Sequence, residues 1–192
     1  MFARRKQVPS SAARITRRLC FACATVLALG SRARSQPAAE PIHRELRLIA
    51  QAMAFLRHPP EGAVDVAIVY PAGSPDGRAA AERIGDAFGS GVSAGSVILY
   101  PRLLTVSEIS STPGLTALLL TDAALPDAAV VAAAVAGKGV LTVAFDPAAV
   151  SAGLVVMAVR GHPRVEITVS RAAAQAAGVE FSTPFRLMIQ ER

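Results

Sequence analysis

The sequence predicts an α/β fold, a small three-layer sandwich with a mostly parallel sheet, a C-terminal antiparallel hairpin and capping helices. Two observations predict it. Runs of consecutive apolar residues alternate with helical segments between residues 64 and 145, which is typical of a parallel sheet with both faces covered. Later, the strand-like segments AGLVVMAV and RVEITV are joined only by RGHP, and a connection this short allows an antiparallel hairpin but no crossover.

The first elements of the domain are a helix, a strand and a second helix. Over residues 42–58 the apolar positions recur every three or four residues and so line one helical face. These positions are Ile42, Leu46, Ile49, Met53 and Leu56. Pro59 and Pro60 are expected to end this helix. A buried strand, Val64–Tyr70, follows, and then a helix over residues 76–89 that stops at its last glycine.

The middle of the chain repeats this unit. The second strand, SVILYPRLL, contains Pro101 and is expected to be shorter than its apolar run, because proline is tolerated in a strand only at an edge, bend or bulge. A third strand, Ala117–Thr121, and a helix from about Pro126 to Ala136 come next. The strand Val140–Phe145 is apolar apart from Thr142, so we expect it to lie centrally with its phenylalanine buried.

The C-terminal hairpin leads into capping helices. In RVEITV, the period-two alternation of a strand sends three apolar residues toward the core and three polar residues to the opposite face. The apolar set is Val165, Ile167 and Val169, and the polar set is Arg164, Glu166 and Thr168. A helix over residues 170–178 closes at its glycine, and the apolar turn FRLMI follows. Arg164 and Glu166 are thus expected on a solvated or partner-facing surface, close to Arg171 at the start of the helix.

The N-terminal segment has the three-part build of a secretory signal peptide. A basic stretch to Arg18 precedes the apolar run LCFACATVLALG, which is too short to span a bilayer, and a small-residue exit follows. We expect residues 1–35 to be the cleaved signal peptide, residues 36–41 a linker and residues 42–192 a single domain in the periplasm. Twin arginines before the apolar run leave two routes open, twin-arginine export and general secretion.

Cleavage of this segment removes every thiol of the chain. The small-residue rule favours cleavage after Ala33 or Ser35, and both cysteines, Cys20 and Cys23, lie before these positions. The exported protein is therefore expected to have no disulfide and no cysteine ligand or nucleophile.

The charge distribution argues against a nucleic-acid partner. Eight of the 20 Lys and Arg but none of the 14 Asp and Glu lie in the first 35 residues, so the remainder carries 12 basic and 14 acidic residues. A protein that binds phosphate backbones needs its basic residues on the folded part. The excess of basic residues in the whole chain comes from its first 35 residues.

Residues that could carry catalysis or hold a metal do not form a motif. His43, His58 and His162 are widely spaced, with no HxxH or HxH pair, whereas a metal site needs three or four convergent ligands. The candidate nucleophiles Ser107, Ser110, Ser111 and Ser151 lie outside any G-x-S-x-G pattern. We expect no enzymatic activity, no metal and no cofactor.

The loop YPAGSPDGR follows the first strand, where a doubly wound sheet binds ligands at the carboxyl ends of its strands. It matches no phosphate-binding motif. Two interpretations stay open. In one, Ser74 or Asp76 caps the next helix by accepting hydrogen bonds from first-turn amides. In the other, Gly73, Ser74, Asp76 and Gly77 form a loop for a small or anionic ligand.

The order of elements from Ile42 to Met188 resembles the YfiR/HmsC-like family of small periplasmic proteins. GVLTVAFD, residues 139–146, is similar to the family's V-L-T-V strand, and SAGLVVMAV, residues 151–159, to its next apolar strand, with one glycine kept. RVEITVSRAAAQAAGV, residues 164–179, is similar to its F-E-I-N-L strand and A-G-L helix end. The chain departs from the family where His58 and Pro59 replace a tryptophan-proline pair.

The resemblance implies regulation rather than catalysis. The family's best-understood member holds an inner-membrane diguanylate cyclase inactive by binding its periplasmic domain. We therefore expect a regulator in cyclic-di-GMP signalling whose partner is the periplasmic domain of an inner-membrane signalling protein, with Arg164, Glu166 and Arg171 at the contact. A homodimer stays open. The alternative function is a small-ligand binding module resembling one lobe of a periplasmic solute-binding protein.

Overall fold

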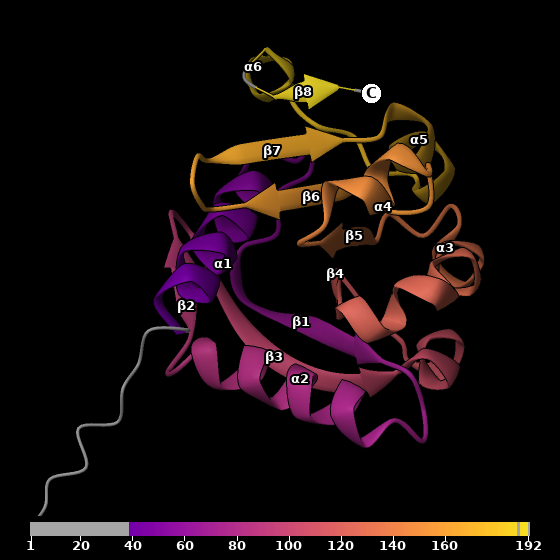
Figure 1. The fold of residues 1–192 in the computed structure, drawn as a ribbon. Coiled ribbons are helices and arrows are strands. Elements are labelled where there is room, and N and C mark those ends of the chain that lie inside the picture. Colours follow the sequence, from indigo (N-terminus) through magenta and orange to yellow (C-terminus); the bar gives the residue numbers. More distant parts are fainter. Residues whose placement is uncertain (1–38, 188, 192) are drawn as a thin grey trace, which may run out of the picture. The chain divides into compact units, whose positions relative to one another are not determined.

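The computed structural model describes residues 39–187 and 189–191, which belong to one compact unit, Ser35–Arg192. Its eight strands form one sheet in the order β2-β3-β1-β4-β5-β6-β7-β8 (Figure 1). The strands are β1 (Gly62–Tyr70), β2 (Val92–Ala94), β3 (Val97–Thr105), β4 (Ala117–Leu120), β5 (Leu141–Ala144), β6 (Met157–Arg160), β7 (Glu166–Val169) and β8 (Gln190–Glu191). The predicted signal peptide lies outside the described residues.

Helices connect these strands and cover the sheet. The α-helices are α1 (Ala39–Ala54), α2 (Pro75–Ala87), α3 (Ala128–Val135), α4 (Pro147–Ser151), α5 (Arg171–Ala177) and α6 (Thr183–Arg186). Two 3₁₀ helices, η1 (Val106–Ser111) and η2 (Asp122–Asp127), complete the set. None of the helices in residues 39–187 combines the length and the apolar character that a membrane crossing requires.

The predicted α/β fold is confirmed. Strands β3, β1, β4, β5 and β6 are mutually parallel, and β6 and β7 form the predicted antiparallel hairpin, in which Met157 pairs with Val169 and Arg160 with Glu166. In chain order the parallel strands run 2-1-3-4-5, the arrangement of a doubly wound sheet. The direction in which successive strands are added to the sheet therefore reverses between β1 and β4.

Two apolar cores lie on the two faces of the sheet. One contains the buried faces of α1, α2 and α5, including Leu46, Ile49 and Met53 of the predicted helical stripe. The other lies under η1, η2 and α3 and includes Ala128 and Val131. The sheet curves so that α1 contacts both β2 and β6, as Figure 1 shows. Burial on both faces explains why the central strands are largely apolar.

Helix α1 differs from its prediction at both ends. It begins at Ala39, within the predicted linker, and it ends at Ala54, before the prolines that were expected to stop it. The reason is tertiary pairing. Leu56 forms an antiparallel bridge with Phe181, and the amide of Arg57 donates to the carbonyl of Glu180 at 2.8 Å. These backbone groups therefore bond to a distant segment instead of continuing the helix.

The expectation of a shortened second strand was wrong. β3 extends over nine residues and pairs with β1 along its whole length, with Pro101 opposite Val66. On its other side β3 pairs with β2 only from Val97 to Leu99. Pro101 therefore lies where the outer side of β3 has no partner strand among the described residues, so the missing N–H costs no ladder bond there.

The strand ending in Phe145 is also shorter than predicted. β5 stops at Ala144, and Phe145 is only partly buried, although it packs against the core. Asp146 then turns the chain into α4, because its carboxylate accepts a hydrogen bond from the amide of Ala148 at 2.9 Å. This cap and Pro147 at the first helical position start α4, which lies between the predicted strand Val140–Phe145 and the predicted hairpin strand AGLVVMAV.

The alternation predicted for RVEITV holds only in part. Val169 is buried and Ile167 packs against the core, but Val165 lies before the strand begins and is 48% exposed. Thr168, expected on an open face, is 1% exposed because α4 covers this part of β6 and β7. The polar face of β7 is thus open at Glu166 and closed two residues later.

Candidate functional site

The C-terminal segment and the end of α1 come together although they are distant in sequence. The amide of Ser182 donates to the carbonyl of Phe55 at 2.8 Å, which adds to the hydrogen bond between Arg57 and Glu180. The ring of Phe185 stacks on Phe55 with centroids 5.4 Å apart and lies 5.0 Å from the ring of Phe181. These backbone and ring contacts hold residues 179–186 against the end of α1.

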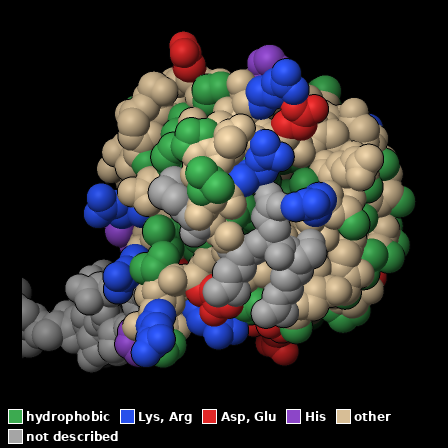
Figure 2. Space-filling view, turned by 90° about the horizontal axis from the view of Figure 1, so that it is seen from above, with side chains coloured by type: hydrophobic (Ala, Val, Ile, Leu, Met, Phe, Trp, Pro, Cys, Tyr) green, Lys and Arg blue, Asp and Glu red, His purple; other side chains and the backbone are tan. Residues whose placement is uncertain are grey.

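A groove of about 660 Å³ opens beside this junction. We call it the basic groove. Its lining residues are Arg57, Val169, Arg171, Ala174, Gln175, Gly178, Val179, Glu180, Phe181, Ser182, Thr183 and Arg186. Three guanidinium groups and one carboxylate are among them. Figure 2 shows Lys and Arg side chains gathered on the face that carries α6 and β8, with an acidic and a His side chain beside them.

The charges of the basic groove act on one another. Arg57 forms an ion pair with Glu180. This hydrogen bond and its charge lower the pKa of Glu180 and raise that of Arg57, and His58 and Arg186 lower the pKa of Glu180 further. Glu180 is therefore ionised at neutral pH, and its charge is directed mainly at Arg57. Arg186 donates to the neutral hydroxyl of Thr183 at 3.3 Å.

Helix α5 forms one wall of the basic groove, and it closes at Gly178 as predicted. The hydroxyl of Ser170 accepts a hydrogen bond from the amide of Ala173 at 3.2 Å, and Gly178 closes the helix in the left-handed region with φ of 75°. The amides of Gly137 and Gly139 donate to the carbonyls of Ala176 and Ala177 at 2.9 and 2.7 Å. The loop that contains Gly137 and Gly139 thus supplies hydrogen bonds to carbonyls that the end of a helix leaves without an intrahelical partner.

The structure separates the three predicted partner-binding residues. Arg164 and Glu166 lie at the start of β7, next to the hairpin turn, whereas Arg171 follows the other end of the strand and lines the basic groove. At about 3.3 Å per residue, roughly 15 Å of backbone lies between Glu166 and Arg171. Two surfaces therefore replace the single predicted one.

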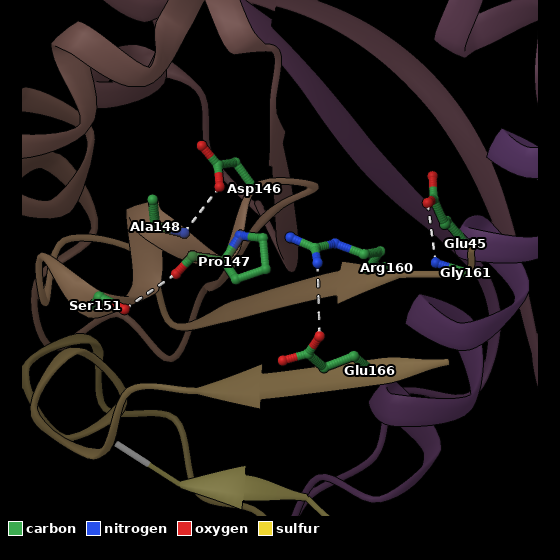
Figure 3. Close-up of polar contacts among 8 residues, drawn as sticks. All are labelled: Glu45, Asp146, Pro147, Ala148, Ser151, Arg160, Gly161 and Glu166. Carbon is green, nitrogen blue, oxygen red and sulfur yellow. Dashed lines mark hydrogen bonds and ion pairs between the residues drawn. The ribbon is translucent and has the colours of Figure 1, made fainter. Parts of the chain in front are cut away.

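The hairpin end is held in place by polar contacts, which Figure 3 shows. Across the two strands, Nη1 of Arg160 lies 3.8 Å from Oε2 of Glu166. The amide of Gly161 donates to the carboxylate of Glu45 on α1 at 3.0 Å. Arg164 and Val165 lie just beyond these contacts and are exposed. We call residues 162–165 the hairpin turn.

The predicted ligand loop lies at the carboxyl end of β1, where the winding of the sheet reverses. The hydroxyl of Ser74 accepts a hydrogen bond from the amide of Gly77 at 3.0 Å and so caps α2. A Cβ on Gly77 would come within 2.9 Å of that hydroxyl oxygen, which explains the glycine. Asp76 lies in the first turn of α2, and Gly73 is exposed with a φ of 74°. The capping interpretation is confirmed for Ser74.

The three histidines have different surroundings. His43 Nδ1 donates to the carbonyl of Ala87 at 3.1 Å, His58 lies near Glu180, and His162 is exposed in the hairpin turn. Within residues 39–187 and 189–191, no three His, Cys, Asp or Glu side chains form a group that could hold a metal ion.

Sequence reasoning missed Arg57, Glu180 and Arg186. They lie in separate segments, and no motif links them. The one available signal was the set of aromatic residues beside them, Phe55 on one side and Phe181 on the other, but a single sequence does not tell which aromatic side chains meet. Arg171 was found only because it follows the hairpin.

The fold and its surfaces define an α/β protein with a mostly parallel, doubly wound sheet, an exposed hairpin turn and a basic groove beside its last helices. No protein-family model matches the chain, and no curated protein matches it.

Proposed function

We propose that this protein is a periplasmic regulator that binds and restrains an inner-membrane signalling enzyme, such as a diguanylate cyclase, by contacting its periplasmic domain. The motifs that resemble the YfiR/HmsC-like family lie in the part of the chain that forms β5, β6, β7 and α5. In this proposal the action is a protein–protein contact, with no reaction at the surface.

The hairpin turn is the observation that carries this proposal. Val165 exposes 48% of its surface, and the charged Arg164 precedes it. An apolar side chain beside a charged one on a fixed backbone is compatible with the apolar centre and polar rim of a protein–protein contact. Here the backbone is fixed by the β6–β7 ladder and by the bond between Glu45 and Gly161. Little ordering is then required when a partner binds.

A site-specific photo-crosslinking experiment tests the proposal. A photoreactive amino acid at position 165 should form an adduct with a membrane protein that carries a cytoplasmic signalling domain. The same amino acid at Val130, which is 57% exposed on α3, is the control and should form no such adduct. Adducts of equal yield at both positions, or none at position 165 in cells that contain both proteins, would contradict the contact.

A small-ligand binding module is the second candidate function. The observation that favours it is the position of the loop at Gly73 and Ser74 at the carboxyl end of β1, where the winding of the sheet reverses between β1 and β4, because open α/β sheets bind ligands at that place. The Ser74 hydroxyl already caps α2, however, so a ligand there would depend on other groups. Gly73→Ala with unchanged signalling in cells would speak against this candidate, since the loop conformation at φ 74° would be strained.

A further inference from the structure

We propose that the basic groove docks an acidic segment of the partner protein, with carboxylates of that segment bound among the guanidinium groups of Arg57, Arg171 and Arg186. This inference rests on the proposed function and adds a second contact to it. It makes the partner's charge, rather than its apolar surface, the recognition element at this end of the sheet.

The charge of the basic groove carries the inference. Its three guanidinium groups come from three separate parts of the chain, the segment after α1, the start of α5 and the end of α6. Among the described residues that line it, only Glu180 is acidic, and the carboxylate of Glu180 is bound to Arg57. Guanidinium groups bind carboxylates through parallel hydrogen bonds, which gives both strength and orientation. A chain with aspartate or glutamate residues is therefore the complementary occupant.

The size and lining of the basic groove suit a few side chains of a bound segment. Its volume of about 660 Å³ falls within the range of sites that hold small ligands. Ala174, Val179 and Phe181 provide apolar lining between the charged residues. The wall that carries Arg186 is fixed by the aromatic contacts of Phe185 with Phe55 and Phe181. Side chains of the segment can therefore contact both the apolar lining and the guanidinium groups.

Charge changes at Glu180 and at Arg186 should shift the affinity for an acidic segment in opposite directions. Because the carboxylate of Glu180 competes with an incoming one for Arg57, Glu180→Gln should strengthen binding of an acidic segment. Arg186→Glu should weaken it, because the positive charge becomes negative. Arg83→Glu is the matched control, since Arg83 is exposed on α2, does not line the basic groove and undergoes the same charge change.

The complete coding sequence is expressed, and the protein that the cells produce from it is purified. Binding of a fluorescent octaglutamate peptide to this protein is measured by fluorescence anisotropy. We expect Arg186→Glu to weaken binding about tenfold or more, Glu180→Gln to strengthen it about threefold, and Arg83→Glu to change it less than twofold. Arg171→Glu serves as a second groove variant if Arg186→Glu fails to fold. Circular dichroism checks the fold of each variant.

Equal weakening by Arg186→Glu and Arg83→Glu would overturn the inference, because binding would then depend only on net charge. No binding by the unaltered protein would also overturn it. Failure of the proposed function is recognised separately, by a deletion strain whose signalling does not change. Binding of the peptide with the expected signs would support the basic groove as an acidic-segment site in either case.

Discussion

Arg57, three residues beyond the end of α1, forms an ion pair with Glu180, which lies 123 residues later in the chain. The backbone beside this pair is joined as well, by the hydrogen bond from the amide of Arg57 to the carbonyl of Glu180. The pair therefore marks the place where the first helix meets the last part of the domain, and it forms part of the basic groove.

The Arg57–Glu180 pair should make stability depend on pH. The ion pair lowers the pKa of Glu180 in the folded protein, so the unfolded chain binds a proton more readily. The contribution of this carboxylate is present above pH of about 4.3 and is lost as pH falls through its folded value. The free energy of unfolding of Glu180→Gln, compared with that of the unaltered protein between pH 3 and 7, should differ at the upper end and converge at the lower end.

Salt provides the control for this pH dependence. Both side chains are more than 60% exposed, so the difference should shrink when NaCl is raised from 0.05 to 1 M, where the screening length is about 3 Å. A difference that is constant across pH and salt would show that the pair contributes nothing to stability.

Two buried threonines should respond in opposite ways to replacement by valine. The hydroxyl of Thr142 accepts a hydrogen bond from the buried amide of Val156 at 2.9 Å, whereas the buried hydroxyl of Thr168 has no partner among the described residues. Thr142→Val should lower the free energy of unfolding by about 1–3 kcal/mol, because it leaves that amide unsatisfied. Thr168→Val should be neutral or stabilising by up to about 1 kcal/mol. Urea melts measure both, and a larger loss for Thr168→Val would contradict its burial without a partner.

Phe88 and Phe145 should differ in their contribution to the core. Phe88 is 1% exposed and belongs to the larger core, while Phe145 is partly buried and lies just past β5. Phe88→Ala should cost about 3–5 kcal/mol, and Phe145→Ala about 1–3 kcal/mol because part of its ring stays in water in the folded protein. An equal or greater loss for Phe145→Ala in denaturant melts would place it at the centre of the fold instead.

The elements that could be predicted from the sequence are those whose signals are local. The buried strands beginning near Val64 and Ala117 are largely apolar runs bounded by loops, and the end of α5 is set by Gly178. The hairpin followed from the shortness of its connection, since four residues cannot form a crossover. Each of these features depends on residues within a few positions of one another.

The wrong predictions concern segments whose structure depends on contacts with distant parts of the chain. The end of α1 was misplaced because residues 55–57 pair with residues 180–182, and β3 is long because β1 supports it along its entire length. Thr168 is buried by α4, a helix that the apolar run before β6 did not reveal. The basic groove was missed for the same reason, as its arginines meet only through these contacts.

The most direct test of the regulatory function is the intracellular concentration of cyclic-di-GMP in three strains. They are the deletion, the deletion complemented with the unaltered gene, and the deletion complemented with Arg164→Glu plus Val165→Asp. Both residues of the double variant are exposed in the hairpin turn, so the protein should fold and keep its abundance. If the protein restrains a diguanylate cyclase, the concentration of cyclic-di-GMP rises in the deletion, returns to normal with the unaltered gene and stays raised with the double variant. An unchanged concentration in the deletion strain would contradict the regulatory function.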